Sequence, residues 1–250
     1  MDKDELREKA ISETRGELES SVEKDQLLVK AVKQLDQIQN DFREEMEKLR
    51  DWYSLHFPEL EEELTEDDEF LKILEKFGVE RSEIEPFSGM AESSTGSKLE
   101  EQDREMIEDM VSTLVSMKEM RDSLEDYVGR GAKEEFGNLS GLLGPVLATR
   151  LVSLAGGLEE LAKKPSSTVQ MLGAEKALFR YLHGEGSPPK HGVLFHHEFV
   201  KSLPEDVRGK MARFMANKAV MAARLDQYGD KDKSKELREE ASERYEKLSS

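Results

Sequence analysis

Two stretches of the chain repeat apolar residues at alternating steps of four and three, and this spacing limits the fold more than any other feature. The first stretch consists of Leu28, Val32, Leu35, Gln39, Phe42, Met46, Leu49 and Tyr53, with Gln39 as its one polar position. The second consists of Met106, Met110, Thr113, Met117, Met120, Leu124 and Tyr127. A repeat of this kind predicts long amphipathic helices that pack along a coiled-coil seam.

The two predicted helices can fold back on each other as an antiparallel coiled coil. The residues between them predict a short helix over Glu66–Phe77, which ends at Gly78, and a flexible loop from Pro86 to Ser97. The alternative is a pair of separate amphipathic helices in an ordinary bundle. The strict 4-3 spacing of both stretches favours the coiled coil.

The composition changes near Gly129, where glycine becomes frequent, charges become sparse and apolar residues become dense. No alternation typical of strands appears, so the sequence predicts an all-α protein. We expect a charged segment over 1–24, a coiled coil over 25–136, a compact domain over 137–229 and a charged helix over 230–250. Within the compact domain, helices are predicted over 138–154, 158–163, 166–172, 174–182, 198–202 and 205–227.

The chain contains no cysteine, which excludes disulfides and thiolate metal sites. No apolar run approaches the roughly 20 residues of a membrane span, and the first residues do not resemble a signal peptide. We therefore expect a cytoplasmic protein without membrane contact.

The formal net charge of −18 is unevenly distributed. Residues 150–224 contain 12 Lys and Arg against 7 Asp and Glu, whereas the rest of the chain contains 25 against 48. This asymmetry fits a basic contact module on an acidic support. It fits equally well a compact domain that has fewer surface carboxylates than exposed helices.

Motifs for catalysis are missing from the sequence. It has no glycine-rich phosphate or dinucleotide motif and no serine in a nucleophile elbow. His196, His197 and Glu198 are adjacent, so their side chains diverge and do not match a metal-binding spacing. We expect no enzymatic activity, no cofactor and no metal.

RNA contact has better support. Lys163 and Lys164 precede Pro165 and a helix that begins at Ser166, and a helix start with two lysines can hold phosphate. His191, His196 and His197, near Tyr181 and Phe195, offer rings that can stack on unpaired bases. Solvated lysines and ordinary surface histidines are the alternative explanation of these residues.

Several ordered blocks of the sequence resemble the Nop domain family. The blocks are Leu49-Arg50-Asp51-Trp52-Tyr53-Ser54-Leu55-His56-Phe57-Pro58-Glu59-Leu60, Gly137-Asn138-Leu139, Arg150-Leu151 through Ala155-Gly156-Gly157-Leu158, Leu161-Ala162-Lys163-Lys164-Pro165-Ser166-Ser167-Thr168, Leu172-Gly173-Ala174-Glu175-Lys176-Ala177-Leu178-Phe179-Arg180, Gly192-Val193-Leu194-Phe195-His196, and Ala216-Asn217-Lys218 to Ala223-Arg224-Leu225-Asp226. This family includes the core scaffolds of box C/D guide ribonucleoproteins and a related pre-mRNA splicing factor.

The resemblance implies an all-helical scaffold whose coiled coil dimerises and whose Nop domain recognises a kink-turn RNA. That RNA is already bound by a small ribosomal-protein-like kink-turn binder. The RNA-binding residues implied are Lys163, Lys164, Ser166, Lys176, Arg180, His196 and Arg224. Those facing the partner protein are Gly173, Ala174, Glu175 and Phe179, and those of the homodimer's coiled coil are Leu35, Phe42, Leu49, Met110, Met117 and Leu124.

The implied function is the support of guided 2′-O-methylation in rRNA processing. Family scaffolds usually carry an N-terminal domain that binds the methyltransferase fibrillarin, whereas here a charged segment of about 24 residues precedes the coiled coil. The expectation of a fibrillarin partner therefore stays open. Two alternatives are a splicing-factor-like role, which Phe199-Val200-Lys201-Ser202-Leu203-Pro204 resembles, and a coiled-coil assembly protein without RNA binding.

Overall fold

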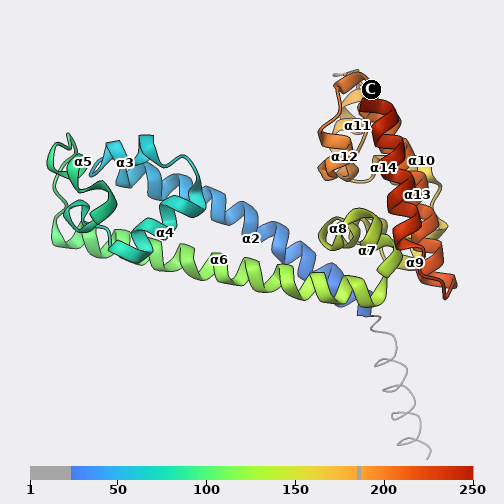
Figure 1. Cartoon of the computed structure of the whole chain (residues 1–250), viewed down its shortest axis with the longest axis horizontal. Coiled ribbons are helices and arrows are strands. Elements are labelled where there is room, and N and C mark those ends of the chain that lie inside the picture. The colour runs from blue at the N-terminus through green and yellow to red at the C-terminus, as the bar shows by residue number, and fades with distance from the viewer. Residues whose placement is uncertain (1–23, 185–186, 250) are drawn as a thin grey trace, which may run out of the picture. The chain divides into compact units, whose positions relative to one another are not determined.

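The described part of the chain is helical, as the sequence predicts. A computed structural model describes residues 24–184 and 187–249, and within them it contains α-helices and short 3-10 helices (η) but no strand (Figure 1). The predicted charged segment over 1–24 lies almost entirely outside these residues. The chain divides into two compact units. Unit 1 joins the described residues up to Lys33 to those from Glu125 onward, and unit 2 spans Gln34–Leu124.

Unit 2 is built on parts of two long helices, α2 (Lys24–Tyr53) and α6 (Glu101–Glu135). The segment between them contains α3 (Pro58–Glu63), α4 (Asp67–Phe77), η1 (Arg81–Glu83), η2 (Glu85–Phe87) and α5 (Ser88–Glu92). In unit 2 the long helices are antiparallel, because Ser97 donates its N–H to Leu55 O at 2.8 Å and Arg121 lies 5.3 Å from the Phe42 ring centroid.

The first predicted seam is confirmed. All of its apolar residues are buried, at exposures of 6% or less: Leu28, Val32, Leu35, Phe42, Met46, Leu49 and Tyr53. Leu35, Phe42 and Leu49 are therefore covered by the chain's own helices. The expectation that these three residues contact a second copy stays a prediction, and their side chains have little surface left for such a contact.

The second predicted seam is wrong by one residue. Ile107, Val111 and Leu114 are buried, whereas Met106 and Met120 are 48% and 53% exposed. The observed seam continues through two charged residues, Lys118 and Arg121, so the spacing of apolar residues in the sequence does not reveal it. Lys118 and Arg121 both lie near the Asp68 carboxylate, at 3.4 and 3.6 Å, and the Arg121 guanidinium also packs on Phe42.

The segment that follows α2 holds the 86–97 region in place. His56 is 1% exposed, and its Nδ1 lies 2.7 Å from Ser97 O. Arg81 donates to the carbonyls of His56 and Gly96 at 2.9 Å each. The prediction of a flexible loop over Pro86–Ser97 is thus wrong in part, because this region contains α5 and is fixed by hydrogen bonds.

Arg50 and Glu59 complete this network. Arg50 donates to Asp67, Glu61 and the Leu64 carbonyl, each at 2.8 Å, and so joins α2 to the ends of α3 and α4. Hydrogen bonds from Ser94 and Thr95 lower the pKa of Glu59 to about 2. The sequence block over residues 49–60, which resembles the Nop family's signature, therefore connects the end of α2 to the segment that follows it.

Unit 1 contains the remaining helices. They are α7 (Gly137–Leu143), α8 (Pro145–Ala155), α9 (Leu158–Lys163), α10 (Ser166–Met171), α11 (Glu175–Leu182), η3 (Val193–His196), α12 (Glu198–Lys201), α13 (Glu205–Tyr228) and α14 (Ser234–Ser249). The single helix predicted over 138–154 is wrong, because it breaks at Gly144 (φ +81°) and Pro145 into α7 and α8, which meet at 117°.

Within the described residues, no single helix is long and apolar enough to cross a membrane. The bent pair of α7 and α8 passes that test of length and composition together. Leu139, Leu142, Leu147, Leu151 and Val152 of this pair are buried in the core of unit 1.

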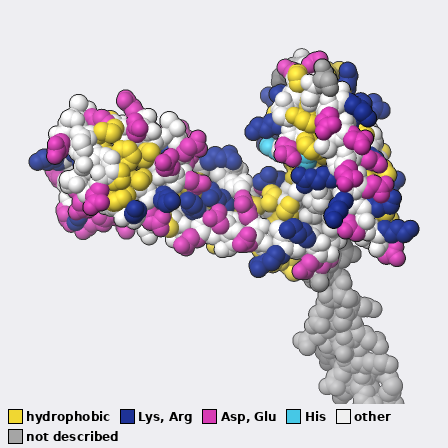
Figure 2. All heavy atoms as spheres, viewed as in Figure 1, with side chains coloured by type: hydrophobic (Ala, Val, Ile, Leu, Met, Phe, Trp, Pro, Cys, Tyr) yellow, Lys and Arg dark blue, Asp and Glu magenta, His cyan; other side chains and the backbone are white. Residues whose placement is uncertain are grey.

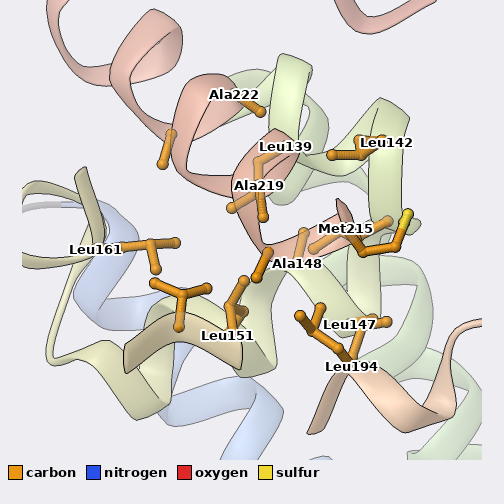
Figure 3. Close-up of a cluster of buried hydrophobic side chains, with 14 of the residues drawn as sticks. Leu139, Leu142, Leu147, Ala148, Leu151, Leu161, Leu194, Met215, Ala219 and Ala222 are labelled. Atoms are coloured by element: carbon orange, nitrogen blue, oxygen red, sulfur yellow. The ribbon is translucent and has the colours of Figure 1, made fainter. Parts of the chain in front are cut away.

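Helix α13 is the centre of this core. Its inward face is rich in alanine and methionine, and it packs against α7, α9, α10 and α14. Figure 3 shows Met215, Ala219 and Ala222 of α13 among leucines of α7, α8 and α9. Small side chains on one face allow several short helices to approach the same central helix.

The end of α13 is tied to the start of α7. The Asp226 carboxylate accepts hydrogen bonds from the backbone N–H groups of Asn138 and Leu139 at 2.9 Å each, and from Asn138 Nδ2 at 2.8 Å. Asn138 Oδ1 in turn accepts the N–H of Lys233 at 2.6 Å, just before α14. Burial raises the pKa of Asp226.

Helix α14 is part of unit 1, although the predicted boundary at residue 230 separated it from the compact domain. Leu237 and Ala241 are 3% and 0% exposed, and Tyr245 and Leu248 pack on the same core. The spacing of these four residues places them on one face of a helix that is otherwise charged.

The observed register of α6 can be tested in unit 2. Replacing Leu114, which is 1% exposed, by alanine is expected to lower the free energy of unfolding by about 2–4 kcal/mol, because the substitution leaves a cavity. Thr113→Ala is the matched control and should change it by less than about 0.5 kcal/mol. Denaturant unfolding followed by the fluorescence of Trp52, the single tryptophan, measures both. If both substitutions lower the free energy of unfolding by the same amount, the observed register of α6 is contradicted and the register predicted from the sequence is supported.

Candidate nucleic-acid interface

The junction of α9 and α10 carries the predicted lysines. Lys163 is exposed in the last turn of α9, Lys164 follows in extended conformation, and Ser166 begins α10 as predicted. Lys163 Nζ lies 2.8 Å from Glu159 and 3.2 Å from Glu160. Hydrogen bonds to these two glutamates raise the pKa of Lys163. The lysine is therefore charged at neutral pH, in exposed pairs that a phosphate can displace at small cost.

Arg224 reaches the same junction from α13. Its Nε donates to the carbonyl of Ala162 at 2.9 Å, at the end of α9. This bond places the guanidinium beside the segment that carries Lys163 and Lys164. Arg224 is exposed, so the rest of its fork remains open to solvent.

The outward face of α13 extends from Arg224 and forms a stripe that sequence reasoning missed. The α13 stripe consists of exposed residues at helical spacing, with no carboxylate among them: Lys210, Arg213, Asn217, Met221, Arg224 and Tyr228. Within residues 24–184 and 187–249, neither Lys210 nor Arg213 is in an ion pair. By contrast, Lys218 on the neighbouring face pairs with Glu240 of α14. The 3-4 spacing was visible in the sequence, but pairing and exposure were not.

Helix α11 exposes most of its surface. None of its residues is buried, and Phe179 and Leu182 are 64% and 71% exposed. Lys176, Phe179 and Arg180 line an open hollow of about 560 Å³ together with Glu175. Phe179 also stacks on His183, with 4.1 Å between ring centroids. The helix thus offers cations, an aromatic pair and apolar side chains to a partner.

The start of α11 is set by Gly173 and its neighbours. Gly173 has φ +83°, and its N–H donates to Glu175 Oε1 at 2.9 Å. Ala174 is 8% exposed, which leaves it little surface for a partner. Of the four residues predicted to face a partner protein, Glu175 and Phe179 therefore have the accessible side chains.

The histidine-bearing segment after α11 pairs with the end of α10. Gly192 donates its N–H to Gln170 O at 2.8 Å, and Val193 donates to Leu172 O at 2.7 Å. A Cβ atom on residue 192 would lie 1.9 Å from Leu172 O, so this approach requires glycine. The pairing places η3 beside α10 and the start of α11.

The three histidines of this segment have different surroundings. His196 is exposed, as expected for a residue that contacts RNA, and it lines a hollow of about 380 Å³ with Gly173, Ala174 and His191. His191 stacks on Phe195 at 4.7 Å between centroids, and the Arg208 guanidinium lies 5.5 Å from the same ring. Burial lowers the pKa of His191.

The expectation that the His197 ring stacks on RNA bases is wrong, because this side chain is buried and holds α12 in place. His197 is 7% exposed, its Nδ1 accepts the N–H of Phe199 at the start of α12, and its Nε2 lies 3.3 Å from Leu142 O. Because His197 is buried and His196 is exposed, the two side chains diverge. Burial lowers the pKa of His197.

The charge of the chain is concentrated in unit 2. Residues 34–124 contain 27 Asp and Glu against 10 Lys and Arg, so this unit carries almost all of the formal charge of −18. On the face seen in Figure 2, basic side chains lie among acidic ones over unit 1. Unit 2 therefore repels a polyanion, whereas unit 1 is close to neutral.

The described residues form an all-helical protein that exposes lysine, arginine and aromatic side chains on α9 to α13. The chain belongs to the Nop family: residues 34–247 match the family model described as "snoRNA binding domain, fibrillarin". This result confirms the resemblance seen in the sequence.

Curated proteins and a solved structure agree with this assignment. The chain is 35% identical over 221 residues to an uncharacterised NOP5 family protein of Methanocaldococcus jannaschii, covering 83% of this chain and 53% of that protein. It is 34% identical over 242 residues to nucleolar protein 56 of Homo sapiens, covering 88% and 40%. It therefore spans about half or less of these relatives. A crystal structure of a fibrillarin/Nop5p complex matches with a TM-score of 0.58 at 26% identity, covering 97% of this chain and 77% of that one.

The cytoplasmic location expected from the sequence is contradicted by these relatives. Those from Mycosarcoma maydis, Homo sapiens and Saccharomyces cerevisiae are named nucleolar proteins. The expectation rested on the absence of cysteine and of a targeting segment. A reducing environment is common to cytosol and nucleus, so cysteine usage does not separate the two.

The buried His197 predicts a pH dependence of stability. Its folded-state pKa lies below the ordinary value of 6.5, so the unfolded chain binds a proton that the folded chain does not. Stability is therefore full above that value and is lost as pH falls toward the folded pKa. His197→Asn keeps an acceptor for the Phe199 N–H but does not titrate. Between about pH 7.5 and about pH 5.5, the melting temperature is expected to fall less in the variant than in the wild-type chain. An equal fall in both would show that His197 is not the origin of the pH dependence.

Proposed function

We propose that this chain is a non-enzymatic RNA-binding scaffold of a box C/D-type ribonucleoprotein. It recognises a kink-turn RNA that already carries a small kink-turn-binding protein, and it supports guided 2′-O-methylation. Membership of the Nop family and the names of the relatives support the type of particle. The contacts of unit 1 support the mode of recognition.

The observation that carries this proposal is the α13 stripe. A row of exposed cations without carboxylate partners is free to bind an anion, because no ion pair has to be broken first. Arg213 lies three residues after Lys210, and Arg224 lies eleven residues, or about three turns, further along the same face. A row of this length suits phosphates spread along a nucleic-acid backbone. Arg224 also connects the row to Lys163 and Lys164.

The need for a protein already bound to the RNA follows from the weak charge of unit 1. Few phosphate contacts on a near-neutral surface give little affinity by themselves. Helix α11 adds exposed apolar side chains, Phe179 and Leu182, which suit a protein surface better than a phosphate. We therefore assign α11 to the composite surface of RNA and small binder, with Lys176 and Arg180 toward the RNA.

The same proposal includes a homodimer through α6. The residues of the predicted second seam form an apolar stripe that one chain leaves partly exposed: Met106, Met110, Met117, Met120 and Leu124. Exposed apolar residues at 4-3 spacing are typical of a helix that packs against another helix. The dimer thus involves Met110, Met117 and Leu124, as expected, without Leu35, Phe42 and Leu49.

A second candidate function is a coiled-coil assembly protein without RNA binding, favoured by the charge of unit 2. A splicing-factor-like particle is a variant of the main proposal, and the RNA that co-purifies with the chain distinguishes the two. Fibrillarin enters the proposal because the matching solved structure is a fibrillarin/Nop5p complex.

Binding to a kink-turn RNA preloaded with the small binder tests the RNA proposal. Arg213→Ala is expected to weaken binding roughly three- to ten-fold and to lower the slope of log affinity against log salt by about 1, because one phosphate contact is lost. Lys163→Ala and His196→Ala are also expected to weaken it. Lys247→Ala, on α14 and paired with Glu243, is the matched control. If the wild-type chain leaves the complex unshifted in a gel, the assembly-protein function is favoured instead.

Sedimentation equilibrium tests the dimer. Replacing both Met110 and Met117 by glutamate is expected to convert a dimer to a monomer, because buried charges would face each other across the interface. Ser112→Glu adds a similar charge on a different face of α6 and should leave the dimer intact. A wild-type chain that is monomeric at micromolar concentration would refute this part of the proposal.

A further inference from the structure

Helix α14 is strongly charged, yet it is held firmly in unit 1. Nine of the 16 residues over Ser234–Ser249 are Asp, Glu, Lys or Arg. A helix of this length and composition is marginal alone in water, so its contacts with unit 1 must stabilise it. Its contacts fall into two groups, one with α7 and α13 and one with α12.

The first group anchors the start of α14. Ser234 packs against α7 so closely that a Cβ atom on residue 141 would lie 2.5 Å from the Ser234 Cβ. Leu237 and Ala241 are buried in the core, and Glu240 pairs with Lys218 of α13. These contacts account for the attachment of α14 to unit 1.

The second group connects α14 to α12. The Tyr245 ring stacks on Phe199, with 5.0 Å between centroids and 22° between planes. The Tyr245 hydroxyl lies 3.1 Å from Ser202 Oγ, and Arg238 lies 3.6 Å from the Glu198 carboxylate. Two of these contacts thus reach α12, which has four residues, and the third reaches Ser202 directly after it.

Helix α12 directly follows the segment that presents His196. It is too short to be stable as a helix by itself. His197 caps it and contacts Leu142 O, and Arg208 donates to Lys201 O at 3.2 Å. The contacts with α14 add to these. The position of α12, and with it the end of the segment that presents His196, therefore depends in part on α14.

We propose that α14 braces the His196-bearing segment in its RNA-binding position, with Tyr245 as the positioning residue. This inference rests on the proposed function. Tyr245 does not contact the RNA; it acts through Phe199 and α12 on His196. The charged outer face of α14 remains in contact with solvent. The apolar stripe of the same helix carries Tyr245, whose contacts restrain α12.

The test compares three variants of the full chain. Tyr245→Ala removes the ring stack, Tyr245→Phe keeps the stack and loses the hydroxyl, and Glu239→Ala changes an exposed position of α14. An aromatic pair of this kind is worth about 0.5–1.5 kcal/mol, so Tyr245→Ala is expected to weaken binding to the RNA with its small binder roughly three- to ten-fold. Tyr245→Phe should recover most of the affinity, and Glu239→Ala should retain all of it.

Two readouts separate positioning from general instability. In a double-mutant cycle, Tyr245→Ala should cost much less affinity when His196 is already alanine, because both changes act on the same contact. The NMR signal of the His196 ring should shift in Tyr245→Ala and remain in place in Glu239→Ala. If the losses of affinity from Tyr245→Ala and His196→Ala are additive, or if the His196 signal does not shift, the proposal that α14 positions His196 is overturned.

A failure of the proposed function gives a different result. If the wild-type chain does not bind the RNA complex, the RNA proposal fails, and the NMR signal alone then decides whether α14 positions His196. A variant Tyr245→Ala that loses helical content by circular dichroism would be replaced by Tyr245→Leu. That variant keeps an apolar contact without the ring stack and is expected to show the same shift.

Discussion

The carboxylate of Asp226 is the contact on which the arrangement of unit 1 depends most. It accepts two backbone N–H groups and one amide N–H at the start of α7, and the same Asn138 side chain accepts an N–H from the residues that lead into α14. One carboxylate and one amide therefore join the end of α13 to α7 and α14. Without this pairing, buried donors would lose their partners at a cost of about 1–3 kcal/mol each.

Helix α13, held at this end, has two functions on its two faces. Alanine and methionine on the inner face receive α7, α9, α10 and α14, which fixes the junction that carries Lys163 and the segment that carries His196. The outer face presents the α13 stripe. The core and the proposed RNA surface are thus properties of the same helix, and a change in its packing would move both.

Much of this was predictable from the sequence, and the failures have physical reasons. The first seam follows directly from apolar spacing. The register of α6 did not, because Lys118 and Arg121 lie in the seam and pair with Asp68. The dipeptide Gly144-Pro145 was a visible signal for the break between α7 and α8. The α13 stripe and the burial of Ala174 depend on which cations find carboxylates and which side chains are covered, and only the folded chain shows this.

Ultraviolet cross-linking of the assembled RNA complex, with mass spectrometry of the linked peptides, tests the central claim that unit 1 contacts RNA through α13 and the His196 segment. The account predicts cross-linked peptides from residues 205–228 and 189–197 and none from the acidic residues 34–124. Cross-links concentrated in residues 34–124, or a complete lack of them on α13, would contradict it.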